Sequence, residues 1–382
     1  TAIAAAISVI GVRPGAGEAS ATRPGERGRD VFLVANAFDG TVDLFGQRSL
    51  RRVEQIDVAP DYRQCVGSAT TPGDAASCVV DNQLSADGIL LLNDDLRVSP
   101  GGRVLYVSRP SLGDVAAFDL RTEQMLWRVA VAGLHPDHLA LSPDGTRLLV
   151  SAKSADVVEV IDTRSATIVD RFPTGDSPHG NDYSEDGELV YNGSMGRGTS
   201  DAMPCRCWLT VVDAETMDVE RVIEFDQGIR PFVVTPNGST AYIQLTLLHG
   251  FVEYSLEHER VLRTVQLPLT DETTLLDPGA DRRLSTSHGI ALNDDGTKIC
   301  AAETVSDYVA IVRRQSLSVK GIVPVGDEPA WATSSDDGRY CFVPNRESDD
   351  VSVISYRKAV EVARIEAGDH PRRIRTARVR LR

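Results

Sequence analysis

Histidines, acids and arginines occupy one recurring position in this chain, at the start of an apolar run that leads into a Gly-containing turn. Four of the seven histidines, His135, His138, His179 and His288, fall at or near this position. Neutral imidazole can ligate a metal ion or exchange a proton, and a neighbouring carboxylate can orient the ring. If the fold brings these positions together, the pattern predicts an acid–base or metal site.

The residues at this position receive separate predicted roles. We expect catalytic roles for His138, His179, His288, Arg230, Asp94 and Asp137. We expect substrate binding by Trp331, Asp95, Arg372 and Glu303. Arg230 would orient an anionic or carbonyl group, Trp331 would form an apolar wall, and the three histidines would hold a divalent ion such as copper, zinc or magnesium. The alternative is structural: each ring hydrogen-bonds a neighbouring loop and no cofactor is bound.

A second set of possible metal ligands is soft. Met195, Met203, Cys205 and Cys207 supply two thioethers and two thiols within thirteen residues, a donor set that suits copper. The spacing matches no strong metal motif, and the two cysteines could instead form a local disulfide, pair elsewhere or stay reduced.

Six copies of a short pattern must position all of these residues. Each copy is an apolar run, a turn of the type Ser/Thr-Pro-Asp-Gly and a second apolar run, repeated at about 40 to 58 residues. The turns lie at residues 98–102, 141–145, 183–187, 234–238, 292–296 and 334–338. Several short β-runs per unit at this spacing predict an all-β fold, a β-propeller with four antiparallel strands in each blade.

A seventh unit is divided between the two ends of the chain. Residues 30–57 supply three strands without the innermost one, and residues 373–381 have the character of that missing strand. Pairing them closes the ring in a 3+1 arrangement and leaves no free sheet edge. We therefore predict a single seven-bladed propeller domain over residues 30–382. Residues 1–29 are expected to be a signal-peptide remnant and a disordered tail, because an apolar stretch precedes Ala19-Ser20-Ala21.

Two segments resemble a known repeat. Residues 34–42, Val-Ala-Asn-Ala-Phe-Asp-Gly-Thr-Val, and residues 343–351, Val-Pro-Asn-Arg-Glu-Ser-Asp-Asp-Val, are similar to the Tyr-Val-Thr-Asn (YVTN) repeat of seven-bladed propellers. The resemblance covers nearly all of the chain after residue 30. It implies a superfamily that includes quinoprotein amine dehydrogenase chains, the haem d1 domain of nitrite reductases, lactonases and streptogramin lyases. These proteins share a scaffold rather than a site, so the resemblance predicts the fold and leaves the reaction open.

The long insertions of the repeats are predicted to lie on one face of the disc. They comprise residues 59–92, 193–204 and 268–287, and the first residues of each innermost strand should lie on the same face, at the mouth of the central channel. Because converging loops on a rigid scaffold commonly carry function, this decorated face is the expected site of a small-molecule ligand. It could also receive a protein partner.

Charge and cysteine content limit the compartment and the partners. A formal net charge of −15 argues against nucleic acid, which requires a basic surface, and no segment suits a membrane span. Cys65 and Cys78 flank a loop that a disulfide would staple, which agrees with a secreted, extracytoplasmic protein. We expect Cys300 and Cys341 to be buried free thiols, because adjacent sheets stand about 10 Å apart.

Taken together, these patterns predict an exported propeller that binds a small organic molecule at the channel mouth. His/Asp acid–base or metal-assisted chemistry would transform this molecule, with lyase, hydrolase and oxidoreductase reactions all open. One alternative is a non-catalytic binding or scaffolding propeller. Another is an accessory propeller subunit of an oxidoreductase, which would need a partner that carries the cofactor.

Overall fold

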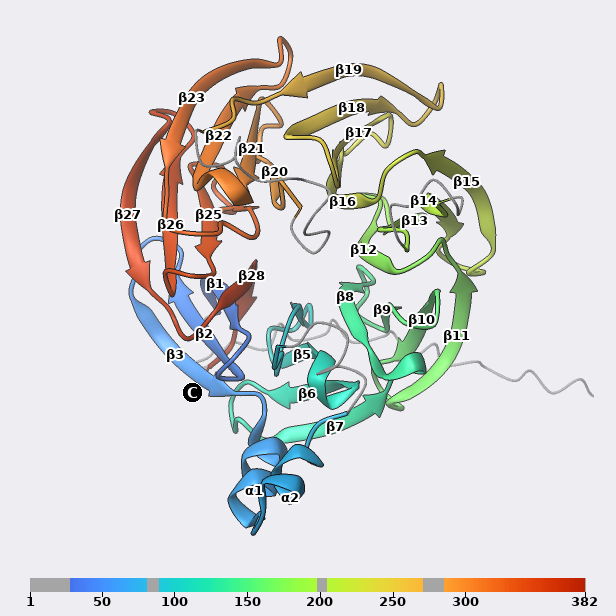
Figure 1. The fold of residues 1–382 in the computed structure, drawn as a ribbon, viewed down its shortest axis with the longest axis vertical. Helices are drawn as coiled ribbons and strands as arrows, with labels where there is room; N and C mark the ends of the chain where they lie inside the picture. Colours follow the sequence, from blue (N-terminus) through green and yellow to red (C-terminus); the bar gives the residue numbers. More distant parts are fainter. Residues whose placement is uncertain (1–27, 81–88, 198–204, 271–284, 382) are drawn as a thin grey trace, which may run out of the picture.

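Seven four-stranded antiparallel sheets surround a central axis in the computed structural model, which describes residues 28–80, 89–197, 205–270 and 285–381. In Figure 1 the innermost strands, such as β8, β12, β16 and β28, surround the axis and the outermost strands form the perimeter. The seven-bladed propeller and its four strands per blade are confirmed. None of the helices in the described ranges is long and apolar enough to cross a bilayer.

The first three blades contain the chain ends and the first two complete repeats. Blade 1 consists of β28 (Pro371–Val379), β1 (Arg29–Asn36), β2 (Thr41–Gly46) and β3 (Arg52–Asp57). Blade 2 consists of β4 (Leu96–Val98), β5 (Val104–Arg109), β6 (Asp114–Asp119) and β7 (Met125–Ala130). Blade 3 consists of β8 (Pro136–Leu141), β9 (Arg147–Ala152), β10 (Val157–Asp162) and β11 (Thr167–Pro173).

The remaining four blades follow in chain order. Blade 4 has β12 (Pro178–Tyr183), β13 (Leu189–Ser194), β14 (Cys207–Asp213) and β15 (Val219–Phe225). Blade 5 has β16 (Ile229–Val234), β17 (Thr240–Leu245), β18 (Gly250–Ser255) and β19 (Arg260–Gln266). Blade 6 has β20 (Ile290–Leu292), β21 (Lys298–Glu303), β22 (Tyr308–Arg313) and β23 (Ser318–Pro324). Blade 7 has β24 (Thr333–Ser334), β25 (Tyr340–Asn345), β26 (Asp350–Ser355) and β27 (Val360–Glu366).

The repeated turns form because their side chains satisfy the local backbone. At residues 142–145 the Ser142 hydroxyl donates to Asp144 at 2.6 Å, and Asp144 accepts the backbone N–H of Thr146 at 3.0 Å. Gly145 takes a φ of +75°, which a residue with a Cβ rarely adopts. A Cβ there would also meet Pro100 of the preceding blade at 2.5 Å. The turn residues therefore position each blade against the one before it.

Apolar side chains fill the space between neighbouring blades. The described residues form seven buried clusters, each of which joins two adjacent sheets around the ring. At the interface between blades 3 and 4, for example, Val160 of blade 3 and Val190 of blade 4 belong to one cluster. Burial of both faces explains why the middle strands are continuously apolar, whereas an outer strand such as β27 alternates exposed and half-buried residues.

The ring closes as the sequence predicted. β28 pairs antiparallel with β1 from Arg29 opposite Val379 to Val34 opposite Ile374, so residues from both ends of the chain form one sheet. Hydrogen bonding between these strands joins the first and last blades and protects the inner edge of β1.

Helices occur mainly in the segment that follows blade 1. Helices α1 (Pro60–Ser68) and α2 (Pro72–Ala76) lie at the outer edge of the disc in Figure 1. Short 3-10 turns occur at Pro110–Leu112, Ala132–Leu134 and Thr304–Ser306. Arg109 anchors α1 to blade 2, since its Nη1 lies 2.7 Å from Asp61 Oδ1.

All six cysteines form disulfides, which confirms one prediction and corrects another. Cys65 is bonded to Cys78, as expected, and Cys205 to Cys207. The prediction of free thiols at Cys300 and Cys341 is wrong: they bond β21 to β25 with a Cα–Cα distance of 6.5 Å. Sheets that radiate from an axis approach each other most closely near it, so the average sheet spacing overestimates the distance between strands close to the centre.

Candidate functional site

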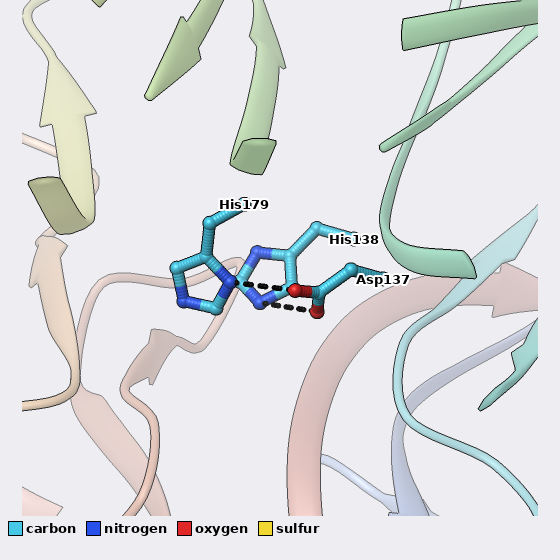
Figure 2. Close-up of side chains that lie close together, drawn as sticks. All are labelled: Asp137, His138 and His179. Atoms are coloured by element: carbon cyan, nitrogen blue, oxygen red, sulfur yellow. Dashed lines mark hydrogen bonds and ion pairs between the residues drawn. The ribbon is translucent and has the colours of Figure 1, made fainter. Parts of the chain in front are cut away.

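Three histidines from three blades lie in contact, and two of them also contact one carboxylate. Asp137 and His138 lie on β8, His179 lies on β12 and His288 lies just before β20. Asp137 Oδ2 is 3.1 Å from His179 Nδ1, and Asp137 Oδ1 is 3.6 Å from His138 Nε2. Figure 2 shows the carboxylate directed at both rings. We call Asp137, His138, His179 and His288 the His cluster.

Irregular pairing of the inner strands places several of these side chains. The register between β8 and β9 shifts between Pro136 and Leu139, where Asp137 and His138 stand opposite one residue of β9. The same irregularity occurs in β12, where His179 is the extra residue. β-bulges re-aim side chains and are common beside functional sites. Equivalent shifts in β16 and between β28 and β1 occur at Arg230 and Arg372.

The third histidine completes a chain of contacts. His179 Nε2 lies 3.1 Å from His288 Nε2, and His288 Nδ1 lies 2.8 Å from the carbonyl oxygen of Ala330. The rings of His138 and His179 are 3.9 Å apart between centroids. His138 and His179 are buried and His288 is half-buried. The cluster therefore crosses from blade 3 through blade 4 to blades 6 and 7.

These contacts outnumber the protons of two neutral imidazoles. The Ala330 carbonyl oxygen can only accept a hydrogen bond, so His288 Nδ1 carries a proton. A carboxylate at Asp137 can also only accept, so His179 Nδ1 carries a proton as well. The two facing Nε2 atoms then have no proton between them unless one ring is charged. The arrangement thus has room for one more positive charge, supplied by a third proton or by a metal ion.

The surroundings favour neutral rings. Burial lowers the pKa of His138 and of His179 well below the ordinary value, and the positive charge of Arg373 lowers both further. Burial also lowers the pKa of His288, with contributions from His179 and then Arg373. Neutral imidazole at ordinary pH is the form that accepts a proton or ligates a metal.

The donor atoms also suit a metal ion. Two imidazole nitrogens on one tetrahedral ion with bonds of about 2.0–2.1 Å lie roughly 3.3 Å apart, close to the observed separation of His179 and His288. Ligand atoms of Asp137, His138 and His179 lie within 4.8 Å of one another. The hydrogen bonds from His179 Nδ1 to Asp137 and from His288 Nδ1 to Ala330 would orient the two rings. Histidine ligands in known metal sites are oriented by hydrogen bonds of this kind.

The other predicted acids lie in ion pairs beside the cluster. Asp94 Oδ1 is 3.0 Å from Arg372 Nε, which joins two of the predicted residues. Asp95 is fully buried and binds Arg375 at 2.9 Å. Cations around Asp95 hold its pKa at about 2 although burial alone would raise it.

Trp331 lies beside the cluster with its ring against two guanidinium groups. The Cζ atoms of Arg373 and Arg375 lie 4.0 Å and 4.8 Å from the ring centroid. The indole forms an edge contact with His138 at 5.4 Å between ring centroids. The ring therefore positions these arginines, and its role as an apolar wall for a ligand stays a prediction.

Glu303 belongs to a different group of contacts. It accepts a hydrogen bond from the Ser287 hydroxyl, and its Oε2 is 3.3 Å from His249 Nδ1. Its side chain is fully buried. His135 contacts the Ser154 hydroxyl at 3.4 Å instead of joining the His cluster.

The soft donor set is dispersed. Cys205 and Cys207 are bonded to each other, which is one of the alternatives that the sequence left open, and neither offers a thiolate in this state. The sulfur of Met195 accepts a hydrogen bond from Arg230 Nη1 at 2.9 Å. Met203 lies outside the described residues.

Sequence reasoning assigned no role to Arg373, which contacts Trp331 and lowers the pKa of the cluster histidines. A signal was present, because Arg373 and Arg375 are two apart on a predicted strand and so share one face. In the structure Arg373 is buried against Trp331 of blade 7.

Comparisons with known proteins support the propeller fold. No protein-family model and no curated protein matches the chain. The fold is similar to a chain of hydrazine synthase from Kuenenia stuttgartiensis, with a TM-score of 0.62 and 18% identity over 75% of this chain and 95% of that one. It is also similar to a putative 6-phosphogluconolactonase from Bacteroides fragilis, with a TM-score of 0.64 and 13% identity over 91% and 98%.

A further similar structure is the dihydro-heme d1 dehydrogenase NirN, with a TM-score of 0.57 and 12% identity. This chain covers 65% of that chain. At such identities the similarities establish the fold, and the absence of a matching family model leaves the YVTN resemblance a prediction.

Proposed function

We propose that this chain is an exported propeller enzyme that binds a small organic molecule at the mouth of its central channel. The His cluster would transform this molecule by acid–base or metal-assisted chemistry in a lyase, hydrolase or oxidoreductase reaction. One observation carries the proposal: the row Asp137, His179, His288 and Ala330 presents three contacts with only two ring protons.

Acid–base chemistry would use the neutral rings as proton acceptors. A proton taken up by His179 or His288 would fill the gap between the two Nε2 atoms, and Asp137 would stabilise the resulting charge. Burial keeps both rings neutral until a substrate or another charge changes the balance. The pair is thus suited to accept a proton and return it.

Metal-assisted chemistry would use the same atoms. His179 and His288 would hold the ion through Nε2, and zinc or copper suits imidazole ligands better than magnesium, which prefers oxygen. A bound ion of this kind would supply a Lewis acid for a carbonyl or an activated water.

Export is proposed on the cysteines. Disulfides such as Cys65–Cys78 and Cys300–Cys341 persist in oxidising compartments and are rare in the cytosol. The acidic net charge agrees with the expectation that nucleic acid is not a partner.

Metal analysis of the purified protein, made without a histidine tag, separates the two chemistries. Inductively coupled plasma mass spectrometry before and after chelator dialysis should find a near-stoichiometric transition metal, lost in His179→Ala and in His288→Ala. His258→Ala, at an exposed histidine, is the matched control and should keep the metal.

A wild-type protein without transition metal would contradict the metal branch and leave the acid–base one. A screen of small organic molecules by thermal shift, with His179→Gln as comparison, then tests the binding site itself. If no molecule stabilises the wild type, the enzyme proposal fails and the non-catalytic or accessory alternatives gain support.

A further inference from the structure

Arg373 is a buried cation, and two of its three guanidinium nitrogens lack a hydrogen-bond partner among the described residues. Its side chain lies on β28 and is 1% exposed. Neither its Nε nor its Nη2 has a hydrogen-bond partner among the described residues. Burying a charged group costs free energy unless the group is paired and hydrogen-bonded. A bound anion would supply the hydrogen-bond acceptors that these two nitrogens lack.

The nearby carboxylates of Asp94 and Asp95 make their shortest polar contacts with groups other than Arg373. Asp95 Oδ1 lies 4.0 Å from Arg373 Nε, which is beyond hydrogen-bond distance. Asp95 instead accepts Arg375 at 3.1 and 2.9 Å and the backbone N–H of Leu139 at 3.0 Å. Asp94 pairs with Arg372. The charges of these acids act on Arg373, but its Nε and Nη2 still donate no hydrogen bond to them.

Stacking holds this guanidinium in place despite its missing hydrogen bonds. Its Cζ lies 4.0 Å from the centroid of the Trp331 ring. A planar guanidinium fixed in this way presents its N–H groups in a rigid fork, the geometry that suits carboxylate and phosphate oxygens.

Arg230 is a second buried guanidinium without a carboxylate partner in the described residues. It extends from β16 of blade 5 and is 8% exposed. Its Nε donates to the Thr246 hydroxyl at 3.1 Å and its Nη1 to the sulfur of Met195 at 2.9 Å. A thioether is a weak acceptor, and burial lowers the pKa of Arg230 to about 10.

Both guanidiniums act on the same histidines. The positive charges of Arg373 and Arg230 each contribute to lowering the pKa of His179 and of His288. The contacts support this placement. Trp331, on which Arg373 stacks, lies 6.2 Å from His288 between ring centroids. Met195, which accepts from Arg230, follows Ser194, the residue paired with Pro178 next to His179. One cation from blade 1 and one from blade 5 therefore lie near the imidazole pair. An anion between them would offset both charges.

We propose that Arg373 and Arg230 bind the oxyanion of the substrate, a carboxylate or a phosphate group, next to the His179–His288 pair. The inference rests on the proposed function in one respect, because it takes the bound anion to be the charged end of the transformed molecule. It names the substrate class as small organic acids or phosphate esters and makes Arg373 the main anion-binding residue.

Anion binding by the purified protein tests this inference directly. Isothermal titration calorimetry with succinate and with inorganic phosphate should detect binding of at least one of them, and the preferred anion distinguishes a carboxylate from a phosphate substrate. We expect Arg373→Met and Arg230→Met each to weaken that binding roughly tenfold or more, as loss of a charge-assisted hydrogen bond implies. Arg364→Met, at a partly exposed arginine paired with Glu361, should bind like the wild type.

Thermal unfolding without added anion separates a binding role from a structural one. Met keeps an apolar stem against Trp331 and removes an unpaired charge, so Arg373→Met should unfold at the same temperature as the wild type or at a higher one. A marked fall in the unfolding temperature, with unchanged anion binding in Arg230→Met, would overturn the proposal.

A histidine variant distinguishes failure of this inference from failure of the proposed function. His179→Gln should retain binding of succinate or phosphate even though the acid–base or metal site is lost. Binding of neither anion to the wild type, or equal binding by both arginine variants and the wild type, would overturn the anion site and leave the proposed chemistry standing.

Discussion

At the residue scale, the candidate site depends on His179. Its Nδ1 contacts Asp137 and its Nε2 contacts His288, so its two nitrogens link an acid to a second imidazole. Each neighbour constrains the proton that the ring can carry, and the carboxylate holds the proton on Nδ1. The Nε2 atom is thereby free to accept a proton or a metal.

Replacing the carboxylate tests this dependence. An amide accepts a weaker hydrogen bond than a carboxylate and can also donate one, so Asp137→Asn would no longer hold His179 in one tautomer. We expect Zn²⁺ binding to weaken roughly tenfold to a hundredfold, as for other outer partners of metal-binding histidines. Competition with a chromophoric chelator measures the affinity.

The exposed carboxyl of Asp170 on β11 provides the control, and Asp170→Asn should bind Zn²⁺ like the wild type. Wild-type affinity in Asp137→Asn would show that the carboxylate does not support a metal site.

At the element scale, a buried group of polar side chains holds the segment that carries His288. The Ser287 hydroxyl donates to Glu303 at the end of β21 and accepts the backbone N–H of Gly250 at 2.9 Å. His249, the residue before β18, and Tyr308, on β22, are titratable groups that face this carboxyl. These contacts fix the backbone next to His288 from two directions.

This group makes stability depend on pH. Burial raises the pKa of Glu303 well above the ordinary value of 4.5. As pH rises above that value, the unfolded chain releases the proton while the folded chain keeps it, so the free energy of unfolding falls until the pH reaches the folded pKa. The contribution is full at low pH and is lost with increasing pH.

Glu303→Gln removes this pH dependence while it preserves the shape of the side chain. Relative to the wild type, the variant should gain about 1.4 kcal/mol in the free energy of unfolding for each pH unit across that interval. Urea unfolding between pH 5 and 7 measures the difference. A constant difference between the two proteins over this range would contradict the assignment of a neutral, buried carboxyl.

At the scale of the whole molecule, closure through β28 determines both stability and the site. β28 is the innermost of the four strands of blade 1, next to β1, β2 and β3, and it also carries Arg372 and Arg373. Without it, β1 would expose an unpaired and apolar inner edge, and unpaired edges promote aggregation.

Deletion of residues 371–382 should therefore prevent folding to a monomer. Size-exclusion chromatography and circular dichroism should report aggregation or loss of the native spectrum. A circular permutant provides the matched comparison, because Arg29 and Val379 are paired neighbours and can be joined by a short linker.

New ends in the permutant belong in the exposed turn at Arg164 and Ser165. This protein should fold with an unfolding temperature close to that of the wild type. A truncated chain that stays monomeric and native would show that closure contributes little.

How far sequence reasoning reaches depends on whether an interaction is local. The strands, the turns and the closing role of residues 373–381 were predictable because alternation, turn chemistry and repeat spacing act over short stretches of chain. Turns such as Ser142 to Gly145 satisfy themselves with their own side chains. The position of His138, His179 and His288 at one end of the inner strands followed from repeat alignment.

Contacts between blades were decided only in the tertiary structure. Repeat alignment places residues at equivalent heights but contains no angle between sheets, so it missed the Cys300–Cys341 disulfide and could not assign Asp94, Asp95 and Asp137 to different partners. β-bulges at these positions also re-aim side chains without a local sequence signal. The sequence by itself thus determined a seven-bladed ring with reactive residues at one end. The packing of distant blades decided that two histidines face each other and that two nitrogens of Arg373 have no hydrogen-bond partner among the described residues.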